Sequence, residues 1–413
     1  MNLLCLSRIT AQHVVKGGME IHLKMLAEGL VKNGHTVRVL TTRRSDGLVG
    51  EETIEGVIYQ YTDTAHSNYF SKWYPLWYSD SSLIIDQLHE KEAIDIVWAE
   101  GGGAYGAVKA LKRLGIPYVP IAQGTIPGDL SSYFRQIKTP LDVAKFIFWF
   151  GIKKYWQFRY ELPYIRDAAK MIVVSNELKR DVEKFYGIAS EHIEVIFNGV
   201  AQEHFFVSSD FRSEIRERFH IPIDALVLFC AGRLIREKGF HVVIEAVSRL
   251  KEKFPNLYLF MSGKGKYEEI LRELSMSLKV DGRVIFTGFV EYSDIPKYYN
   301  ASDIFVSPTF RVEGFPLTFA EAMLCGLPII ASDLGGNPSA VRDNETGFLL
   351  YKRSVDELVE KLDALLADQP LRQTFSHNAL NLAQKEFTQK VMVKRTEEIF
   401  RRIINNQLSI TNQ

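Results

Sequence analysis

The chain has 413 residues, which is too long for one ordinary hydrophobic core and fits two domains. Lys plus Arg balance Asp plus Glu at 50 each, so no overall positive field attracts nucleic acid. The hydrophobic fraction of 46% is that of a globular protein. Cys5, Cys230 and Cys325 lie far apart, which fits neither a disulfide framework nor a metal site. The apolar run at the N-terminus ends before Gln12, too early for a signal peptide or a membrane span. We therefore expect a cytoplasmic, metal-free protein.

The first part of the chain alternates short apolar runs with helical patterns, which is typical of βαβ units and a parallel sheet. A strand at residues 3–6, a helix at 19–33 and a strand at 36–40 form the first such unit. Further strands are expected at 94–99, 118–122 and 171–174. The sequence thus predicts a Rossmann-like N-terminal domain at residues 1–205.

A second alternation predicts another parallel sheet at residues 206–385. Its expected strands are residues 226–230, 257–262, 284–287, 304–307 and 328–331. The tail at 386–413 reads as a helix that mixes Lys, Arg and Glu with spaced apolar residues, and it could cross back to the first domain. The expected fold class is α/β, with two Rossmann-like domains facing each other across a cleft.

The region from Leu141 to Tyr164 stands apart because nine aromatic residues fall between Phe146 and Tyr164. Between Arg135 and Arg166, seven Lys or Arg face two acids. One interpretation is a long helix whose aromatics pack on the sheet, with the cations at its rim. The other is an interfacial patch that meets a lipid-linked or anionic acceptor at the inner face of a membrane. The sequence leaves both open.

The strongest chemical pattern consists of Glu313 and Glu321, which have seven residues between them. A proline at 316 belongs in the first turn of a helix, so a helix should start there. Free backbone N–H groups at a helix start, with their partial positive charge, suit a diphosphate. The candidate donor-binding residues around this turn are Gly314, Phe315, Leu317 and Thr318. The two carboxylates can each accept hydrogen bonds from sugar hydroxyls.

This stretch resembles the central motif of glycosyltransferase family 4, retaining enzymes of the GT-B fold. The resemblance implies that residues 1–205 form the acceptor domain and residues 206–385 the nucleotide-sugar donor domain. It also implies that Glu313 contacts the transferred sugar and Glu321 the ribose of the donor. The segments AGRL at 231–234 and EKG at 237–239 resemble the diphosphate-binding segment of the family. Arg233 and Lys238 would then stabilise the departing diphosphate, a role that otherwise needs a metal.

Two glycine-containing turns agree with the resemblance. Gly263-Lys264-Gly265 resembles the family's turn near the nucleoside, and Gly17-Gly18 its glycine loop in the first domain. Bare backbone there can approach donor phosphate and sugar. Each turn taken alone would be an ordinary strand-to-helix connection.

One departure concerns Gln123, which stands where the family commonly has a histidine before a glycine. Gln123 can donate a hydrogen bond but cannot exchange a proton at neutral pH. The leaving phosphate can take the acceptor's proton instead, so turnover does not require the histidine.

The predicted function is metal-independent transfer of a hexosyl group, with retention, from a nucleotide-diphosphate sugar to a glycan or lipid-linked acceptor in bacterial surface glycan biosynthesis. The alternative is a catalytically silent protein of the same fold that binds nucleotide sugars. A dinucleotide-dependent oxidoreductase is disfavoured because the first strand-to-helix turn lacks a GxGxxG pattern. The sequence identifies neither the nucleobase nor the acceptor.

Overall fold

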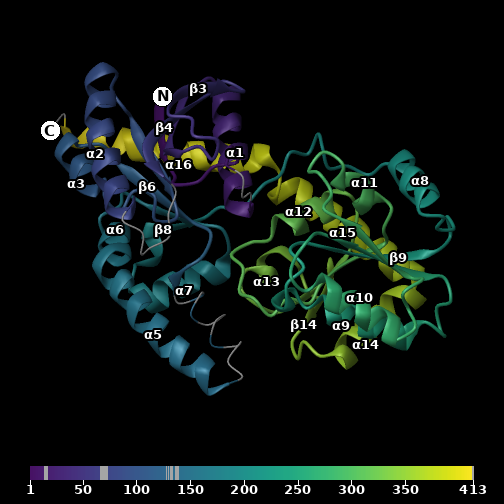
Figure 1. The fold of residues 1–413 in the computed structure, drawn as a ribbon. Helices are drawn as coiled ribbons and strands as arrows, with labels where there is room; N and C mark the ends of the chain where they lie inside the picture. Colours follow the sequence, from purple (N-terminus) through teal and green to yellow (C-terminus); the bar gives the residue numbers. More distant parts are fainter. Residues whose placement is uncertain are drawn as a thin grey trace. The chain divides into compact units, whose positions relative to one another are not determined.

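The computed structural model describes residues 1–13, 17–65, 73–126, 128, 130, 134 and 139–411. The chain divides into two compact units (Figure 1). Unit 1 comprises Met1–Gly199 and Gln389–Gln413, and unit 2 comprises Val200–Thr388. The division lies before Val200 rather than after residue 205, because the N–H of Val200 donates to the carbonyl of Phe387 at 3.0 Å. Phe205 also packs on Tyr299, with ring centroids 6.1 Å apart.

The described part of unit 1 contains an eight-stranded sheet in the order β3-β4-β2-β1-β5-β6-β7-β8. Its strands are β1 (Asn2–Leu6), β2 (Thr36–Arg43), β3 (Gly50–Ile54), β4 (Val57–Ala65), β5 (Ile96–Glu100), β6 (Tyr118–Ala122), β7 (Met171–Val173) and β8 (Ile193–Val195). Every pair is parallel except β3 with β4. All residues of β5 and β6 are buried, as expected for parallel strands covered on both faces.

The antiparallel edge hairpin of unit 1 was not predicted from the sequence. β3 and β4 are joined at Glu55 and Gly56, whose φ angles are 50° and 77°. Two positive φ angles in succession are typical of the tight turns that connect hairpin strands. Most residues of β3 are exposed, so this strand lacks the apolar run that identifies the central strands. The edge strands β8, in this unit, and β14 (Gly347–Leu350), in unit 2, were not predicted either.

The described residues of unit 1 also contain the helices and helical turns that connect its strands, and a C-terminal helix. They are α1 (Gly18–Lys32), α2 (Trp73–Lys91), α3 (Val108–Leu114), α5 (Pro140–Trp156), the π-helical η1 (Gln157–Glu161), α6 (Leu162–Arg166), α7 (Asn176–Tyr186), the 3-10 turn η2 (Ser190–His192) and α16 (Gln389–Thr411). The last helix returns to the first unit, because Gln389 donates to the carbonyl of Met25 at 2.7 Å and Phe400 packs on Trp98.

The aromatic stretch that the sequence left open is a long helical segment, α5 with η1 and α6, that extends away from the sheet in Figure 1. Its C-terminal part packs on unit 1: Tyr164 is buried, and its ring stacks on Tyr118 at 5.4 Å. Phe148 and Phe158, by contrast, are each 64% exposed. The interpretation that the aromatics pack on the sheet is therefore wrong for most of α5.

Unit 2 contains, among its described residues, a six-stranded parallel sheet in the order β11-β10-β9-β12-β13-β14. Its strands are β9 (Leu226–Ala231), β10 (Leu257–Ser262), β11 (Val284–Gly288), β12 (Ile304–Ser307), β13 (Ile329–Ser332) and β14 (Gly347–Leu350). The central Phe229 pairs with Phe260 of β10 and Phe305 of β12. The chain moves outward from β9 to β11, then returns and moves the other way from β12. The switch point therefore lies between β9 and β12, and ligands of open α/β sheets bind at the carboxyl ends there.

The connections of unit 2 are helical. They are α8 (Ser209–Arg218), the 3-10 turn η3 (Arg236–Lys238), α9 (Phe240–Leu250), α10 (Glu268–Ser277), α11 (Ile295–Asn300), α12 (Leu317–Leu324), α13 (Asn337–Ala340), α14 (Val355–Ala367) and α15 (Gln369–Glu386). No helix within the described residues of the chain has the length and apolar character needed to cross a bilayer.

Candidate active site

The loops that follow β9 and β10 in unit 2 lie backbone to backbone. A Cβ on Gly263, whose φ is +136°, would lie 1.9 Å from the carbonyl oxygen of Gly232. A Cβ on Gly265 would lie 2.1 Å from that of Leu234. The N–H of Leu234 in turn donates to the carbonyl of Lys264 at 3.0 Å. Glycine is thus required at both positions, because a side chain there would collide with the neighbouring loop at the carboxyl edge of the sheet.

Two of the predicted site residues meet directly. The ammonium of Lys238, in the turn after β9, lies 2.5 Å from a carboxylate oxygen of Glu313, in the loop after β12. Both side chains are about one-fifth exposed. Gly239 has a φ of +74°, and a Cβ there would lie 2.1 Å from the carbonyl oxygen of Pro308. Close packing of the two loops therefore holds the cation and the carboxylate together at the switch point.

A third loop, after β13, supports the backbone of Glu313. The N–H of Gly336 donates to the carbonyl of Glu313 at 2.8 Å. Gly335 has a φ of +58°, and a Cβ on it would lie 2.4 Å from the same oxygen. The position of Glu313 thus depends on a glycine pair that follows a neighbouring strand.

Helix α12 begins at Leu317, with Pro316 in extended conformation before it. The side chains of Phe315 and Leu317 are buried, so these two residues can offer a ligand only their backbone. Gly314 and Thr318 are half-exposed. The first N–H groups of a helix have no partner within the helix, and they carry the positive end of its dipole. This end of α12 follows Glu313 directly and is suited to an anion.

Glu321 lies one turn further into α12 and differs from Glu313 in its surroundings. It is 6% exposed, and burial raises the pKa of its carboxyl to about 7. The hydroxyl of Tyr299 donates to it at 2.7 Å, which opposes that rise. Sequence reasoning missed Tyr299, because nothing in the spacing of residues 299 and 321 indicates the contact.

The remaining predicted cations of unit 2, Arg233 and Lys264, follow β9 and β10. Both side chains are exposed, and neither forms an ion pair within the described residues. These two loops pack on each other, so both cations lie at the edge of the sheet that carries Lys238 and Glu313. The structure therefore brings the predicted residues of unit 2 to one edge.

The predicted residues of unit 1 lie at the corresponding edge of their own sheet. Gly17 and Gly18 are exposed at the start of α1, where the N–H of Gly17 donates to the carboxylate of Glu20 at 2.8 Å. Gln123 follows β6 and exchanges two hydrogen bonds with Asn198, at 2.8 and 3.3 Å. Its amide is therefore held in place by a second amide.

A buried contact between a histidine and a glutamate lies behind the turn after β5, and nothing in the sequence indicated that these two residues meet. His22 of α1 contacts Glu100 at 3.1 Å, and both residues are buried. The second carboxylate oxygen of Glu100 has no hydrogen-bond partner among the described residues. This pair ties α1 to the end of β5 at the switch point of unit 1, between β1 and β5.

Unit 1 also has a pocket of about 170 Å³ at the carboxyl ends of β5 and β6. Its lining includes Gly101, Tyr105, Gly124, Thr125, Glu161 and Tyr164. The Tyr164 hydroxyl is buried and has no hydrogen-bond partner in the described part of the chain. Thr125 and Glu161 are polar side chains of this lining, and they suit a ligand with hydroxyl groups.

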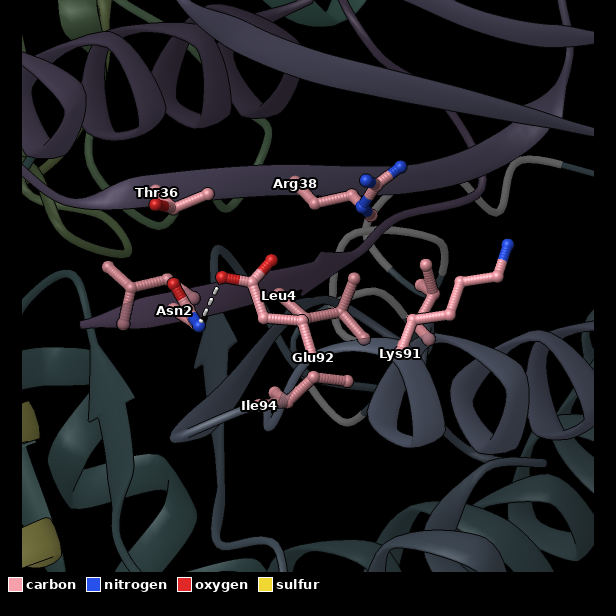
Figure 2. A pocket seen from close by; sticks show the side chains of 9 residues that line it. Asn2, Leu4, Thr36, Arg38, Lys91, Glu92 and Ile94 are labelled. Carbon is pink, nitrogen blue, oxygen red and sulfur yellow. Dashed lines mark hydrogen bonds between the residues drawn. The ribbon is translucent and has the colours of Figure 1, made fainter.

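A smaller pocket, of about 90 Å³, lies at the opposite edge of the same sheet (Figure 2). Asn2 and Thr36, at the amino ends of β1 and β2, line it together with Arg38 and Lys91. The Asn2 amide donates to Glu92 at 2.8 Å across it. Because ligands of open sheets bind beyond the carboxyl ends of the strands, this pocket is not a candidate for the active site.

Metal-ligating residues do not gather in the described ranges: no three His, Cys, Asp or Glu side chains there could hold one ion together. The cations and backbone N–H groups at the edge of unit 2 are the groups available to an anionic ligand.

Comparison with known proteins identifies the family. The profile of the family "Glycosyltransferase Family 4" matches residues 16–204, and that of "Glycosyl transferases group 1" matches residues 211–382. An uncharacterized glycosyltransferase of Methanocaldococcus jannaschii is 24% identical over 94% of this chain and 95% of its own length. A GDP-mannose-dependent alpha-(1-6)-phosphatidylinositol monomannoside mannosyltransferase of Mycolicibacterium smegmatis is 30% identical, over 49% of this chain and 54% of its own.

Solved structures share the fold along the whole chain. Sucrose-phosphate synthase from Thermosynechococcus elongatus matches with a TM-score of 0.76 and 18% identity, over 98% of this chain and 99% of its own. Anabaena HepE in complex with UDP and glucose matches with a TM-score of 0.72 and 20% identity, over 97% and 99%. The two profiles and these likenesses show that the chain belongs to glycosyltransferase family 4, a family of sugar-transferring enzymes, and has the GT-B fold.

Proposed function

We propose that the protein transfers a hexosyl group from a nucleotide-diphosphate sugar to an acceptor, with retention of configuration and without a metal. The observation that carries the proposal is the contact of Lys238 with Glu313 at 2.5 Å, immediately before the start of α12. One edge of the sheet thus offers a cation and helix N–H groups for a diphosphate. It also offers a carboxylate for the hydroxyls of a sugar.

Donor binding would rearrange this ion pair. A diphosphate placed at the start of α12 competes with Glu313 for the ammonium of Lys238, because phosphate oxygens carry more charge than one carboxylate. Glu313 is then released to accept hydrogen bonds from the transferred sugar. Arg233, which has no ion pair within the described residues, adds a second cation as negative charge grows on the leaving group.

The proton of the acceptor is assigned to the leaving phosphate. In a front-face reaction the acceptor attacks from the side that the diphosphate leaves, so configuration is retained and the departing oxygen lies next to the acceptor hydroxyl. Gln123 cannot take that proton, and its amide, held by Asn198, supplies a hydrogen bond to the sugar instead.

The comparisons support a hexose donor without fixing its base. HepE was solved with UDP and glucose, and the mycobacterial relative is a mannosyltransferase that depends on GDP-mannose. A capsular polysaccharide biosynthesis glycosyltransferase of Staphylococcus aureus is 27% identical over 55% of this chain. We therefore propose a role in glycan biosynthesis.

The acceptor is assigned to the pocket of unit 1. Its volume of about 170 Å³ is roughly ten times what one water needs, which is enough for a sugar ring. Glu161 and Thr125 of its lining offer polar atoms to the hydroxyls of a sugar. Because Tyr105 also lines the pocket, an apolar ring face would complete a site for a glycan.

The experiment is a transfer assay in excess EDTA. UDP-, GDP- and ADP-hexoses are offered with p-nitrophenyl glycosides and with a polyprenyl-diphosphate-linked sugar as acceptors. Release of nucleoside diphosphate measures the rate, and NMR coupling constants of the product give its anomeric configuration. We expect transfer with retention, unaffected by EDTA and strongly reduced in Glu313→Gln. An inverted product, or loss of all transfer on chelation, would contradict the proposal.

A further inference from the structure

Helix α5 presents large apolar side chains to solvent. Ile147, Phe148 and Phe158 are 65%, 64% and 64% exposed, and Phe150 and Tyr155 are exposed as well. No side chain from residue 142 to residue 156 is buried. An exposed cluster of this size needs an explanation, because single exposed apolar residues are ordinary but contiguous groups mark interaction surfaces.

The exposed residues form one face of the helix. Half-buried positions recur at 142, 146, 149, 153 and 156, which is the spacing of a single helical stripe, and only Ile152 and Lys154 are half-buried elsewhere on residues 142–156. At the end of that stripe Trp156 stacks on Tyr160, with centroids 4.5 Å apart, and Tyr160 packs against Tyr78 of α2. The stripe anchors α5 to unit 1. The opposite side, here called the α5 face, carries Val143, Ile147, Phe148, Phe150, Tyr155 and Phe158.

The charged residues from 143 to 160 have one sign. They are Lys145, Lys154 and Arg159, together with Lys153 on the anchoring stripe, and no Asp or Glu occurs in this range. The ammonium of Lys154 lies 5.9 Å from the ring centroid of Phe150 and 5.8 Å from that of Phe158. Aromatic and aliphatic residues bordered by Lys and Arg are the composition of helices that lie in the headgroup region of a membrane.

We propose that the α5 face binds the surface of an anionic lipid bilayer. A bilayer supplies both an apolar layer for the aromatic rings and negative charge for the cations, and it imposes no shape on the helix. The attachment is peripheral, because no described helix could cross the membrane. Helix α5 extends away from the sheet of unit 1 (Figure 1), and the side chains of the α5 face are exposed to solvent.

The α5 face is continuous with the acceptor pocket of unit 1. Helix α5 runs without interruption through η1 into α6, and Glu161 and Tyr164 on these later turns line the pocket. A sugar carried on a lipid could therefore enter the pocket while its lipid stays in the bilayer. This consequence rests on the proposed function, whereas the docking itself does not.

Flotation of the full-length chain with vesicles tests the docking in the absence of donor and acceptor. Vesicles of phosphatidylcholine alone are compared with vesicles that also contain phosphatidylglycerol. We expect binding to the anionic vesicles only, weakened by salt as the Debye length shortens. The triple variant Ile147→Ser, Phe148→Ser, Phe158→Ser should lower partitioning by on the order of a hundredfold or more. The variant Lys145→Gln should lower it roughly fivefold.

The matched control is Ile223→Ser, which removes a 62% exposed apolar side chain from unit 2 and should float like the wild type. Circular dichroism and donor hydrolysis should be unchanged in the triple variant, which separates docking from sugar transfer. The proposal is overturned if the wild type ignores anionic vesicles, or if the triple variant floats equally well. It is also overturned if light scattering shows a dimer that the triple substitution dissolves, since the α5 face would then bind a second copy.

Discussion

Burial of Glu321 should make the stability of the protein fall as the pH rises. Its pKa is raised from 4.5 to about 7 by burial. Below pH 4.5 the carboxyl is protonated in both the folded and the unfolded chain. Between these two values the folded state keeps a proton that the unfolded state has lost, so the free energy of unfolding decreases with pH. Above about pH 7 the loss is complete.

The size of the effect follows from the two pKa values. At about 1.4 kcal/mol for each tenfold change in proton affinity, the difference between 4.5 and about 7 corresponds to about 3 kcal/mol. The titratable groups around Glu321 do not add their own pH dependence in this range. Burial raises the pKa of Tyr292, Tyr299 and Cys325 far above it, so these groups stay neutral. Glu321→Gln should abolish this contribution, since an amide does not titrate and can still accept from Tyr299.

Urea unfolding of the wild type and of Glu321→Gln, at about pH 5 and about pH 8, gives the free energies of unfolding that test this prediction. The gain in stability of Glu321→Gln over the wild type should be about 2.5 kcal/mol larger at the higher pH, because at about pH 5 the wild type has already lost part of the contribution. Far-UV circular dichroism follows both units, whereas tryptophan fluorescence reports unit 1, which holds all five tryptophans of the chain. Glu360→Gln, at a 72% exposed side chain, serves as control. A stability difference that does not change with pH would refute the reasoning.

Three further outcomes are expected. Lys238→Ala should lower kcat/KM roughly a hundredfold or more while leaving the melting temperature unchanged, and Lys253→Ala, which breaks an ion pair with Asp363 on the same unit, should transfer sugar like the wild type. Gly335→Ala should cost about 1–3 kcal/mol in stability and lower transfer, because its Cβ would displace Glu313; unchanged kinetics would show that the turn does not position this carboxylate. Gln123→Ala should destabilise the chain by about 1–3 kcal/mol because it removes two hydrogen bonds from the buried Asn198 amide, as thermal unfolding would reveal.

The strands were the most predictable part of the fold. Residues 118–122, 257–262 and 304–307 were expected as strands and are β6, β10 and β12 with the same bounds. Parallel strands buried on both faces are continuous apolar runs, so their pattern is local. The hairpin of β3 and β4 was missed, because a polar edge strand and a turn at Glu55 have no such run.

The predicted residues of unit 2 lie along one edge of the sheet, but their arrangement there was not predictable. Backbone requirements are local: an apolar run followed by glycines indicated the loops after β9 and β10. Contacts between distant side chains are not. Lys238 and Glu313 pair across 75 positions, and Tyr299 reaches Glu321 from another helix. The exposure of α5 could not be predicted either, since an apolar pattern does not say whether a surface covers it.

The central claim is that unit 2 holds the donor diphosphate between the start of α12 and two cations. The most direct measurement is a crystal structure of the full-length chain with whichever of UDP, GDP or ADP binds most tightly without a metal. The account predicts phosphate oxygens within hydrogen-bond distance of the Thr318 N–H, with Lys238 and Arg233 on the diphosphate and Lys238 no longer paired with Glu313. A diphosphate bound elsewhere, with that ion pair intact, would contradict it.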